Sequence, residues 1–367
     1  MTIPFLDVRA SSTELGGELN RALQRVVDSG RYVLGQELLD FERTFADYTG
    51  AEHCVGVGSG LDALHLALRA VGIGPGHGVI VPAHTFAATW LAVVHAGAQP
   101  IPVDVDQETF NLDIAGVEDA ITAETRAIVA VHLYGQPVDM DPLLDIARRH
   151  GIAVVEDASQ AHGARYHGRR IGTLGAAASW SFYPSKNLGG IGDGGAITTN
   201  DSGVAERLRI LRNYGASDEG RFEVAGFNSR LDETQAAVLR LKLARLDQWN
   251  GRRREIAAMY SEALSGTGLG LPVEPSFAES VWHQFVLRSR RRDALRAHLE
   301  RNGVPTAIHY PVPPHRQPVF ARFAGYNLPV ASAIADEALS LPIGPHMSDG
   351  DVAHVIAAVN GFDQPDE

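Results

Sequence analysis

Two spacings of apolar residues alternate along the chain, and they predict strands and helices in alternation. Short continuous apolar runs, such as RAIVAV at 126–131, are typical of strands that are buried on both faces. Segments with apolar residues at helical spacing lie between these runs. This order indicates a parallel sheet with helices on both faces. We expect strands at 53–57, 78–81, 99–103, 126–131 and 152–155, and helices at 13–29, 37–48, 62–71, 87–95 and 142–150.

The pattern changes near Leu246, where a long arginine-rich helix (DQWNGRRREIAAMYSEAL) follows. Beyond it lie a strand-like segment, VWHQFVLRS, and a helix-like segment, RRDALRAHLERN. The 367 residues are more than one hydrophobic core usually serves. We therefore expect an α/β fold with a large domain over 1–245, which includes the N-terminal helices, and a smaller C-terminal α+β domain over 246–367.

Composition narrows the possible partners and the compartment. The formal net charge of -12 disfavours nucleic acid, because binding it requires a basic face. The single cysteine, Cys54, cannot form an internal disulfide, which fits a reducing compartment. The N-terminal residues do not resemble a signal peptide, and no apolar stretch is long enough to cross a bilayer. We expect a cytoplasmic protein without a nucleic-acid or membrane partner.

Lysine is rare in this chain, and its two positions differ in context. Of 32 lysine and arginine residues, only Lys186 and Lys242 are lysines. An amine can lose its proton and attack a carbonyl, whereas a guanidinium stays protonated. Lys242 lies in LRLKLARL, which predicts an amphipathic helix. Lys186 follows a predicted strand in the glycine-rich segment SFYPSKNLGG, where partial burial would lower its proton affinity. A solvated lysine in a surface loop is the alternative.

A glycine-rich turn, GVGSGLDAL at 56–64, connects a predicted strand to a predicted helix. Free backbone N–H groups and the helix dipole at such a turn can bind a phosphate. A dinucleotide site would also need an acidic residue at the end of the next strand, and VIVPAHT has none. The turn therefore predicts a phosphate site at Gly60 and Leu61 rather than an NAD site. A plain strand–helix turn remains the alternative.

Polar residues follow two further predicted strands. The apolar strand in VVEDASQAHG ends in Glu156 and Asp157, and ligands bind at strand ends in parallel sheets. A carboxylate there could pair with a protonated pyridine nitrogen, or it could cap the next turn. Ser181, five residues before Lys186, could donate to a phosphate. The segment FNSRLDETQAA at 227–237 opens a helix that Ser229 or Asp232 could cap. The pattern assigns no metal ligand.

These segments occur in an order that resembles the DegT/StrS family of sugar aminotransferases, which are fold-type I enzymes dependent on pyridoxal phosphate. The resemblance runs nearly end to end, and GLDAL at 60–64 is most similar to the subgroup that aminates carbon 3 of deoxysugars. One departure is Leu61, where many relatives have threonine. The matching motifs are FLDVRA, GRYVLGQELLDFERTFADYTG, GSGLDALHLAL, GPGHGVIVPAHTFAAT, VHLYGQPVDM, EDASQAHGA, SFYPSKNLGG, GFNSRLDETQAA and IHYPVPPHRQP.

The resemblance implies a role for each residue that matches a family motif. Lys186 would bind pyridoxal phosphate as a Schiff base and later carry a proton, and Asp157 would pair with the pyridine nitrogen. Asn228 would reach the phosphate of the partner subunit, which implies a homodimer with shared active sites. The remaining cofactor contacts would be Gln160 at the 3-hydroxyl, Phe86 stacked on the ring, and Gly60, Leu61 and Ser181 at the phosphate.

Three further residues, Tyr183, His309 and Tyr310, match segments that face the sugar, although both tyrosines could simply be packing aromatics. The implied substrates are L-glutamate as amino donor and a dTDP-linked 3-keto-6-deoxyhexose as acceptor. A carbon-4 aminotransferase is the alternative closest to this. A deoxygenating or eliminating enzyme would carry histidine in place of Lys186. A non-catalytic regulator and a cysteine desulfurase are more distant, the latter because Cys54 lies in a predicted strand rather than a loop.

Overall fold

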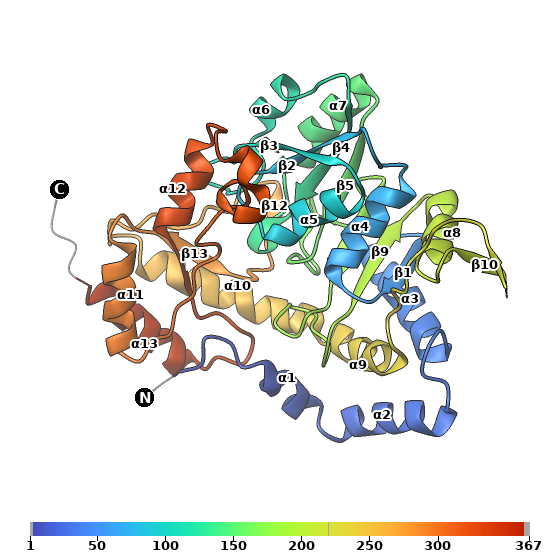
Figure 1. Cartoon of the computed structure of the whole chain (residues 1–367). Helices are drawn as coiled ribbons and strands as arrows, with labels where there is room; N and C mark the ends of the chain where they lie inside the picture. The colour runs from blue at the N-terminus through green and yellow to red at the C-terminus, as the bar shows by residue number, and fades with distance from the viewer. Residues whose placement is uncertain (1–2, 219, 363–367) are drawn as a thin grey trace.

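A seven-stranded sheet forms the centre of the larger part of the molecule (Figure 1). The computed structural model describes residues 3–218 and 220–362. The strand order is β1-β9-β8-β5-β4-β2-β3, and β9 alone runs antiparallel to its neighbours within this sheet. The strands are β1 (His53–Val57), β2 (Gly78–Pro82), β3 (Gln99–Val103), β4 (Thr125–Val131), β5 (Ala153–Asp157), β8 (Ala177–Ser181) and β9 (Gly195–Thr199).

Helices cover both faces of this sheet, as the apolar pattern predicts. Within β2, Val79 and Val81 belong to the hydrophobic core on one face and Ile80 to the core on the other. Successive side chains of a strand point to opposite faces, so a strand covered on both sides reads as one apolar run. One face is covered by α4 (Gly60–Ala70), α5 (Ala87–His95) and α8 (Ser202–Leu211), and the other by α3 (Gln36–Thr49), α6 (Ile114–Asp119), α7 (Met140–His150) and α9 (Glu233–Leu243).

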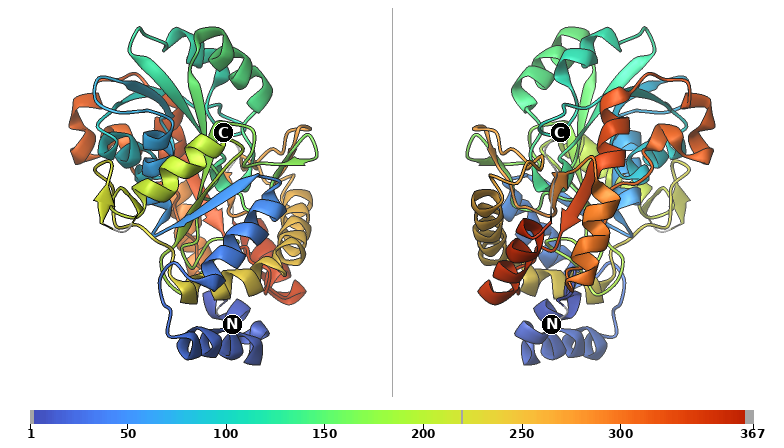
Figure 2. Two further views of the ribbon diagram at one scale, coloured as in Figure 1. Left: turned by 90° about the vertical axis from the view of Figure 1, so that its right-hand side faces the viewer. Right: turned by 90° about the vertical axis from the view of Figure 1, so that its left-hand side faces the viewer.

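The C-terminal part has a hydrophobic core of its own. Figure 2 shows the backbone of the helices that form it, in gold, orange and red. This core surrounds the antiparallel pair of β13 (Phe285–Arg288) and β14 (Ala338–Leu341), and the long helix α10 (Leu246–Ala263) leads into it. The division into 1–245 and 246–367 stays a prediction, and residues 1–2, 219 and 363–367 lie outside the described residues. The other helices of this core are α11 (Arg292–Arg301) and α13 (Asp349–Asn360).

One C-terminal segment packs on the large domain instead. Phe320 and Phe323 contact the ring of Trp90 on α5, with ring centroids 5.1 and 5.2 Å away. These phenylalanines belong to the 3₁₀-helix η3 (Pro318–Phe323), and Ile334 of α12 (Pro329–Glu337) joins the same core. The sequence does not predict that this C-terminal segment packs on the large domain, because its apolar residues do not repeat at a regular helical or strand spacing.

The N-terminal helices correct one prediction. A single helix over 13–29 is wrong, because the chain forms α1 (Val8–Leu15) and α2 (Gly17–Ser29). Asp7 starts α1 early by accepting hydrogen bonds from the N–H groups of Arg9 and Ala10. Gly16, with φ +48°, then ends it. Both helices lie beneath α9 and α10 in Figure 1.

Several short elements escape sequence analysis, because two or three residues cannot show a period. The strand expected in VWHQFVLRS is confined to β13. No helix among residues 3–218 and 220–362 is both long and apolar enough to span a membrane. The short elements are β6 (Arg165–Tyr166), β7 (Arg169–Arg170), β10 (Ala216–Asp218), β11 (Arg221–Phe222), β12 (Ala278–Glu279), η1 (Leu133–Gly135) and η2 (Pro314–Arg316).

The buried carboxylate of Glu156 fixes the connection between β5 and β8. It accepts hydrogen bonds from the backbone N–H groups of Gly172, Leu174 and Gly175, each at 2.9 Å, and from His132 Nε2 at 3.1 Å. Burial alone would raise the pKa of Glu156, but the bonds from His132 and the loop N–H groups outweigh it and hold the pKa below its usual value. Glu156 is therefore a structural residue.

We expect Glu156→Gln to lower the free energy of unfolding of the apoprotein by about 2–4 kcal/mol, because an amide N–H would face buried N–H donors. Urea denaturation followed by circular dichroism measures this change. The matched control is Glu118→Gln, at an exposed ion pair with Arg149, which should leave the urea midpoint nearly unchanged. Equal midpoints for the two variants would contradict the structural role of Glu156.

Candidate functional site

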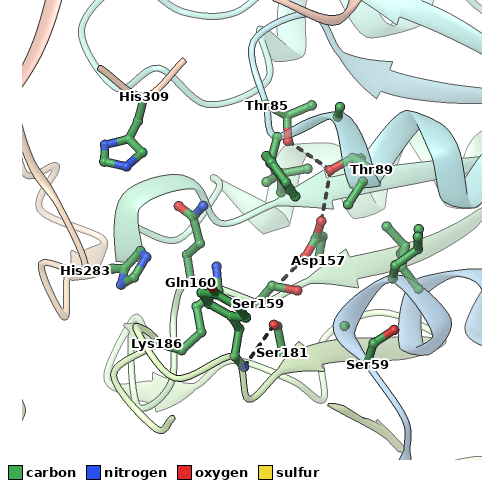
Figure 3. A pocket seen from close by; sticks show the side chains of 18 of the residues that line it. Ser59, Thr85, Thr89, Asp157, Ser159, Gln160, Ser181, Lys186, His283 and His309 are labelled. Carbon is green, nitrogen blue, oxygen red and sulfur yellow. Dashed lines mark hydrogen bonds between the residues drawn. The ribbon is translucent and has the colours of Figure 1, made fainter. Parts of the chain in front are cut away.

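A cavity of about 590 Å³ opens at the carboxyl ends of β5 and β8 and at the first turns of α4 and α5 (Figure 3). Its size lies in the range of small-molecule sites, roughly 300–1,000 Å³. Among the predicted site residues, Asn228 alone does not line it. The predicted residues that do are Gly60, Leu61, Phe86, Asp157, Gln160, Ser181, Tyr183, Lys186, His309 and Tyr310.

Asp157 is the last residue of β5 and points toward α5 (Figure 3). Its Oδ2 accepts a hydrogen bond from Thr89 Oγ1 at 3.0 Å, and its Oδ1 accepts one from the N–H of Ser159 at 3.2 Å. Thr89 Oγ1 lies 2.9 Å from Thr85 Oγ1, so a chain of hydroxyl groups supports the carboxylate. These contacts fix the orientation of Asp157 before any ligand binds.

Lys186 belongs to the segment between β8 and β9, residues 182–194, which we call the lysine loop. The backbone N–H of Lys186 donates to the carbonyl of Tyr183 at 2.8 Å, so the lysine sits at the end of a tight turn. Burial lowers the pKa of Lys186 to about 8, against a smaller opposing effect of the Asp157 charge. Roughly a tenth of this amine is therefore neutral and nucleophilic at pH 7, far more than for an ordinary lysine.

The first turn of α4 meets Ser181 at the other end of the cavity. A Cβ added to Gly60 would lie 2.5 Å from Ser181 Cβ, so only glycine allows this approach. The first N–H groups of a helix have no partner within it, and they attract anions. Leu61 also lines the cavity here and offers its backbone N–H but no hydroxyl. The arrangement of Gly60, Leu61 and Ser181 suits a phosphate.

Gln160 connects three segments at the wall of the cavity. Its Oε1 accepts a hydrogen bond from the N–H of Tyr134 at 2.7 Å, and its Nε2 donates to Tyr310 Oη at 2.8 Å. Tyr134 also donates through its hydroxyl group to the carbonyl of His309. Burial raises the pKa of Tyr310, so its hydroxyl stays protonated. Tyr310 is thus a bonded polar residue of the site rather than a packing aromatic alone.

Two histidines that line the cavity are held neutral. Burial, followed by the charge of Lys186, lowers the pKa of His309 to about 4 and that of His283 well below its usual value. His283 Nδ1 lies 3.1 Å from the side-chain oxygen of Asn187, the residue after Lys186. His309 Nδ1 lies 2.8 Å from Ser340 Oγ. Among the described lining residues, Lys186 is therefore the one side chain that can carry a full positive charge near pH 7.

Two aromatic residues lie open at the mouth of the cavity. Phe86 and Tyr183 are each 55% exposed. The ring of Phe86 lies 5.4 Å from that of Tyr310, tilted by 40°. An exposed aromatic face beside Asp157 and Lys186 is suited to stack on a flat ring.

Asn228 is exposed and lies in the segment that precedes α9. Its neighbour Ser229 donates to Asp62 Oδ2 at 2.7 Å and accepts from the N–H of Gly58 at 3.0 Å, so the segment is held beside the first turn of α4. Ser229 is therefore not the helix cap that the sequence allows, and Asp232 occupies the cap position without a capping hydrogen bond from its side chain.

Sequence analysis missed Thr85, Thr89, Ser159, His283 and Gln284, which also line the cavity. Thr89 lies in the first turn of α5 and Thr85 just before that helix, so no shared helix face marks the pair in the sequence. Ser159 lies two residues after Asp157 and bonds it locally, whereas His283 and Gln284 reach the site only through tertiary packing.

These residues fit a pyridoxal phosphate molecule by their chemistry. Lys186 offers a partly neutral amine, Asp157 an oriented carboxylate, and Phe86 an open aromatic face. The helix start at Gly60, with the hydroxyl of Ser181 against it, offers hydrogen-bond donors for a phosphate. Lys186 would hold the aldehyde end and Asp157 the nitrogen end of the same ring.

Comparisons with known proteins agree with this chemistry. The model of the DegT/DnrJ/EryC1/StrS aminotransferase family matches residues 13–360. The chain is similar to dTDP-3-amino-3,4,6-trideoxy-alpha-D-glucose transaminase of Streptomyces venezuelae, with 55% identity over 97% of this chain and 95% of that protein. It is 48% identical to dTDP-3-amino-3,6-dideoxy-alpha-D-galactopyranose transaminase of Aneurinibacillus thermoaerophilus, over 98% of this chain and 99% of that one.

The fold is also similar to that of a solved structure. A crystal structure of S. venezuelae DesV in complex with a ketimine intermediate superimposes with a TM-score of 0.96 at 55% identity, covering 98% of both chains. The mainly parallel sheet with helices on both faces is therefore the fold-type I architecture that the sequence predicts.

We expect Lys186→Ala to abolish turnover and the visible absorbance of lysine-bound cofactor. Lys186→Arg should be equally inactive, because a guanidinium cannot act as nucleophile or base near neutral pH. Steady-state assays and absorbance spectra of the purified variants measure both effects. Wild-type turnover in either variant would remove Lys186 from the chemistry.

Proposed function

Because the chain belongs to the DegT/DnrJ/EryC1/StrS aminotransferase family, and is a sugar aminotransferase that uses pyridoxal phosphate, we propose that it aminates carbon 3 of a dTDP-linked 3-keto-6-deoxyhexose. The proposed amino donor is L-glutamate. The observation that carries the catalytic part is the meeting of Lys186, Asp157 and the first turn of α4 in one cavity.

Pyridoxal phosphate, when bound, supplies a ring that accepts the electron pair released at the carbon beside the amino group. Asp157 keeps the ring nitrogen protonated, and Thr89 and Ser159 hold its carboxylate in place for this task. Ser181 and the N–H groups at Gly60 and Leu61 bind the phosphate and so fix the distance between ring and lysine.

Lys186 has two tasks in this proposal. Its amine holds the cofactor covalently between reactions, and when released it removes the α-proton of L-glutamate and keeps it at Nζ. Lys186 Nζ would then give up this proton again, and in the half-reaction on the sugar it would carry out the same proton transfers in the reverse order. Burial supports both tasks, because an amine with a pKa of about 8 both accepts and releases a proton near neutral pH.

The charges in the cavity support a shared site between two subunits. Glutamate carries two carboxylates, and the sugar nucleotide and the cofactor add phosphates, yet Lys186 is the one cation among the described lining residues. Buried anions need charged or well-placed partners. We therefore propose that arginines and Asn228 from a partner subunit complete the site, in a homodimer.

The choice of carbon 3 rests on two considerations. Leu61 and the segment GLDAL resemble the carbon-3 subgroup, and both relatives described above are named as transaminases of 3-amino sugars. Position on the sugar depends on how the nucleotide is held, and a displacement of about 1 Å at the reacting atoms can cost roughly a hundredfold in rate. His309, Tyr310 and Tyr183 are proposed to set that position.

The decisive test supplies L-glutamate with matched 3-keto and 4-keto dTDP-6-deoxyhexoses. We expect release of 2-oxoglutarate and a 3-amino product in proton NMR spectra, with Lys186→Ala as the inactive control. Efficient amination of the 4-keto sugar alone would overturn the assignment to carbon 3. Absence of 2-oxoglutarate with every sugar would argue against glutamate as the donor.

Mixed dimers test the shared site. We expect a 1:1 mixture of Lys186→Ala and Asn228→Ala protomers to recover roughly a quarter of wild-type activity, because half of the dimers are mixed and each has one intact site. Each variant alone is the control, and Asn228→Ala must itself be strongly impaired. With subunit exchange verified by mass spectrometry, no recovery would show that each site is built from one chain.

A further inference from the structure

One side of α9 contacts the lysine loop at two points. Gln235 Oε1 accepts a hydrogen bond from the N–H of Ile191 at 2.8 Å, and Lys242 Nζ donates to the carbonyl of Gly189 at 2.7 Å. Gln235 and Lys242 are seven residues apart, so two helical turns bring them onto the same side of α9. The helix therefore binds the loop that carries Lys186 through two backbone groups.

The loop has little freedom between these contacts and Lys186. A Cβ added to Gly189 would lie 2.4 Å from the carbonyl oxygen of Pro184, and one added to Gly190 would lie 2.5 Å from Gln235 Oε1. The N–H of Gly190 also donates to the carbonyl of Phe182 at 2.8 Å. A shift at Gly189 is thus transmitted directly to the turn that places Lys186.

The surroundings of Lys242 differ from those of a surface lysine. It is 3% exposed, whereas the sequence predicts an amphipathic helix with this residue in no special place. No carboxylate within residues 3–218 and 220–362 forms an ion pair with it. Burial lowers the pKa of Lys242 to about 8. Burying an amine is costly, so its single bond to Gly189 needs an explanation.

Both lysines of the chain border one small cavity beneath the lysine loop. This cavity, of about 30 Å³, is also lined by Gly189 and by residues of the N-terminal segment such as Asp7. It lies behind the loop, separate from the large cavity that Lys186 also lines. Gly189 and the residues around Lys186 therefore border the same small cavity, so a shift of Gly189 changes the packing under Lys186.

We propose that Lys242 is a positioning residue for Lys186: its bond to the Gly189 carbonyl, with that of Gln235 to Ile191, holds the lysine loop in the geometry that places the Lys186 amine in the buried site. Lys242 itself does not reach the large cavity and takes no part in proton transfer. The inference rests on the proposed catalytic role of Lys186, but the placement of Lys186 can be measured without turnover.

The two-lysine composition makes a direct measurement possible. Apoprotein labelled with ¹³C at the lysine ε-carbon gives two lysine signals, and in Lys242→Met the remaining signal is that of Lys186. Methionine keeps the length of the side chain and removes the donor. We expect the Lys186 signal to titrate near pH 8 in the wild type, and at higher pH in Lys242→Met because a loosened loop lets water reach the amine.

The holoenzyme supplies a second readout. We expect kcat of Lys242→Met to fall roughly tenfold to a hundredfold, with KM for the donor little changed, because misplacement affects the reaction more than binding. Val26→Ala is the matched control, since Val26 packs on Ala237, on the side of α9 away from the loop. It should lower stability while leaving the Lys186 titration unchanged.

Gln235→Met removes the other contact between α9 and the lysine loop, at a partly exposed residue. This variant replaces Lys242→Met in the test if Lys242→Met does not fold. It should shift the Lys186 titration in the same direction. Unchanged Lys186 titration in every folded variant would overturn the proposal, as would an equal shift in Val26→Ala. Inactive Lys186→Ala together with shifted titrations supports both the catalytic role of Lys186 and its placement by Lys242. An active Lys186→Ala with shifted titrations would overturn the role of Lys186 and leave the placement by Lys242 standing.

Discussion

The alternation of side chains at the ends of β5 and β8 is the constraint on which the site depends. Asp157 and Ser181 point to the face that α4 and α5 cover, while Glu156 and Trp180 point to the opposite core. A slip of one residue in either strand would exchange these neighbours. The four hydrogen bonds to Glu156 oppose such a slip in β5, so the structural carboxylate keeps the functional carboxylate in register.

The sequence predicts the parallel core and part of the proposed site because both leave local signals, whereas Phe86, Gln160 and the sugar-facing residues are implied by the resemblance alone. Buried strands are continuous apolar runs, and Asp157 and Lys186 follow strands at positions where ligands bind. The support of these residues leaves no local signal. Thr89 meets Asp157 across 68 positions, and Gln160 meets Tyr310 across 150. Such pairs depend on the folded arrangement of the strands, which periodicity does not specify.

Two incorrect or incomplete expectations have a physical cause. A glycine within a helical pattern is compatible with a continuous helix, so the break at Gly16 cannot be read from spacing alone. The expectation for Lys242 is incomplete because an amphipathic pattern assumes one exposed face. Helix α9 is instead packed on nearly all sides, against α2, α3 and the lysine loop. A polar residue in such a helix lies on a buried face, and its partner is visible only in three dimensions.

The use of lysine at position 242 follows from the number of acceptors available. Arg253 is also buried, but its guanidinium donates to the carbonyls of Trp282, His283 and Ile343. Lys242 has one carbonyl acceptor, and a guanidinium there would leave most of its five donors unpaired in a buried place. An amine has fewer donors and can become neutral, which burial favours at both lysines. Arginine therefore serves where acceptors are several, and lysine remains where the buried cation has one acceptor or must lose its charge.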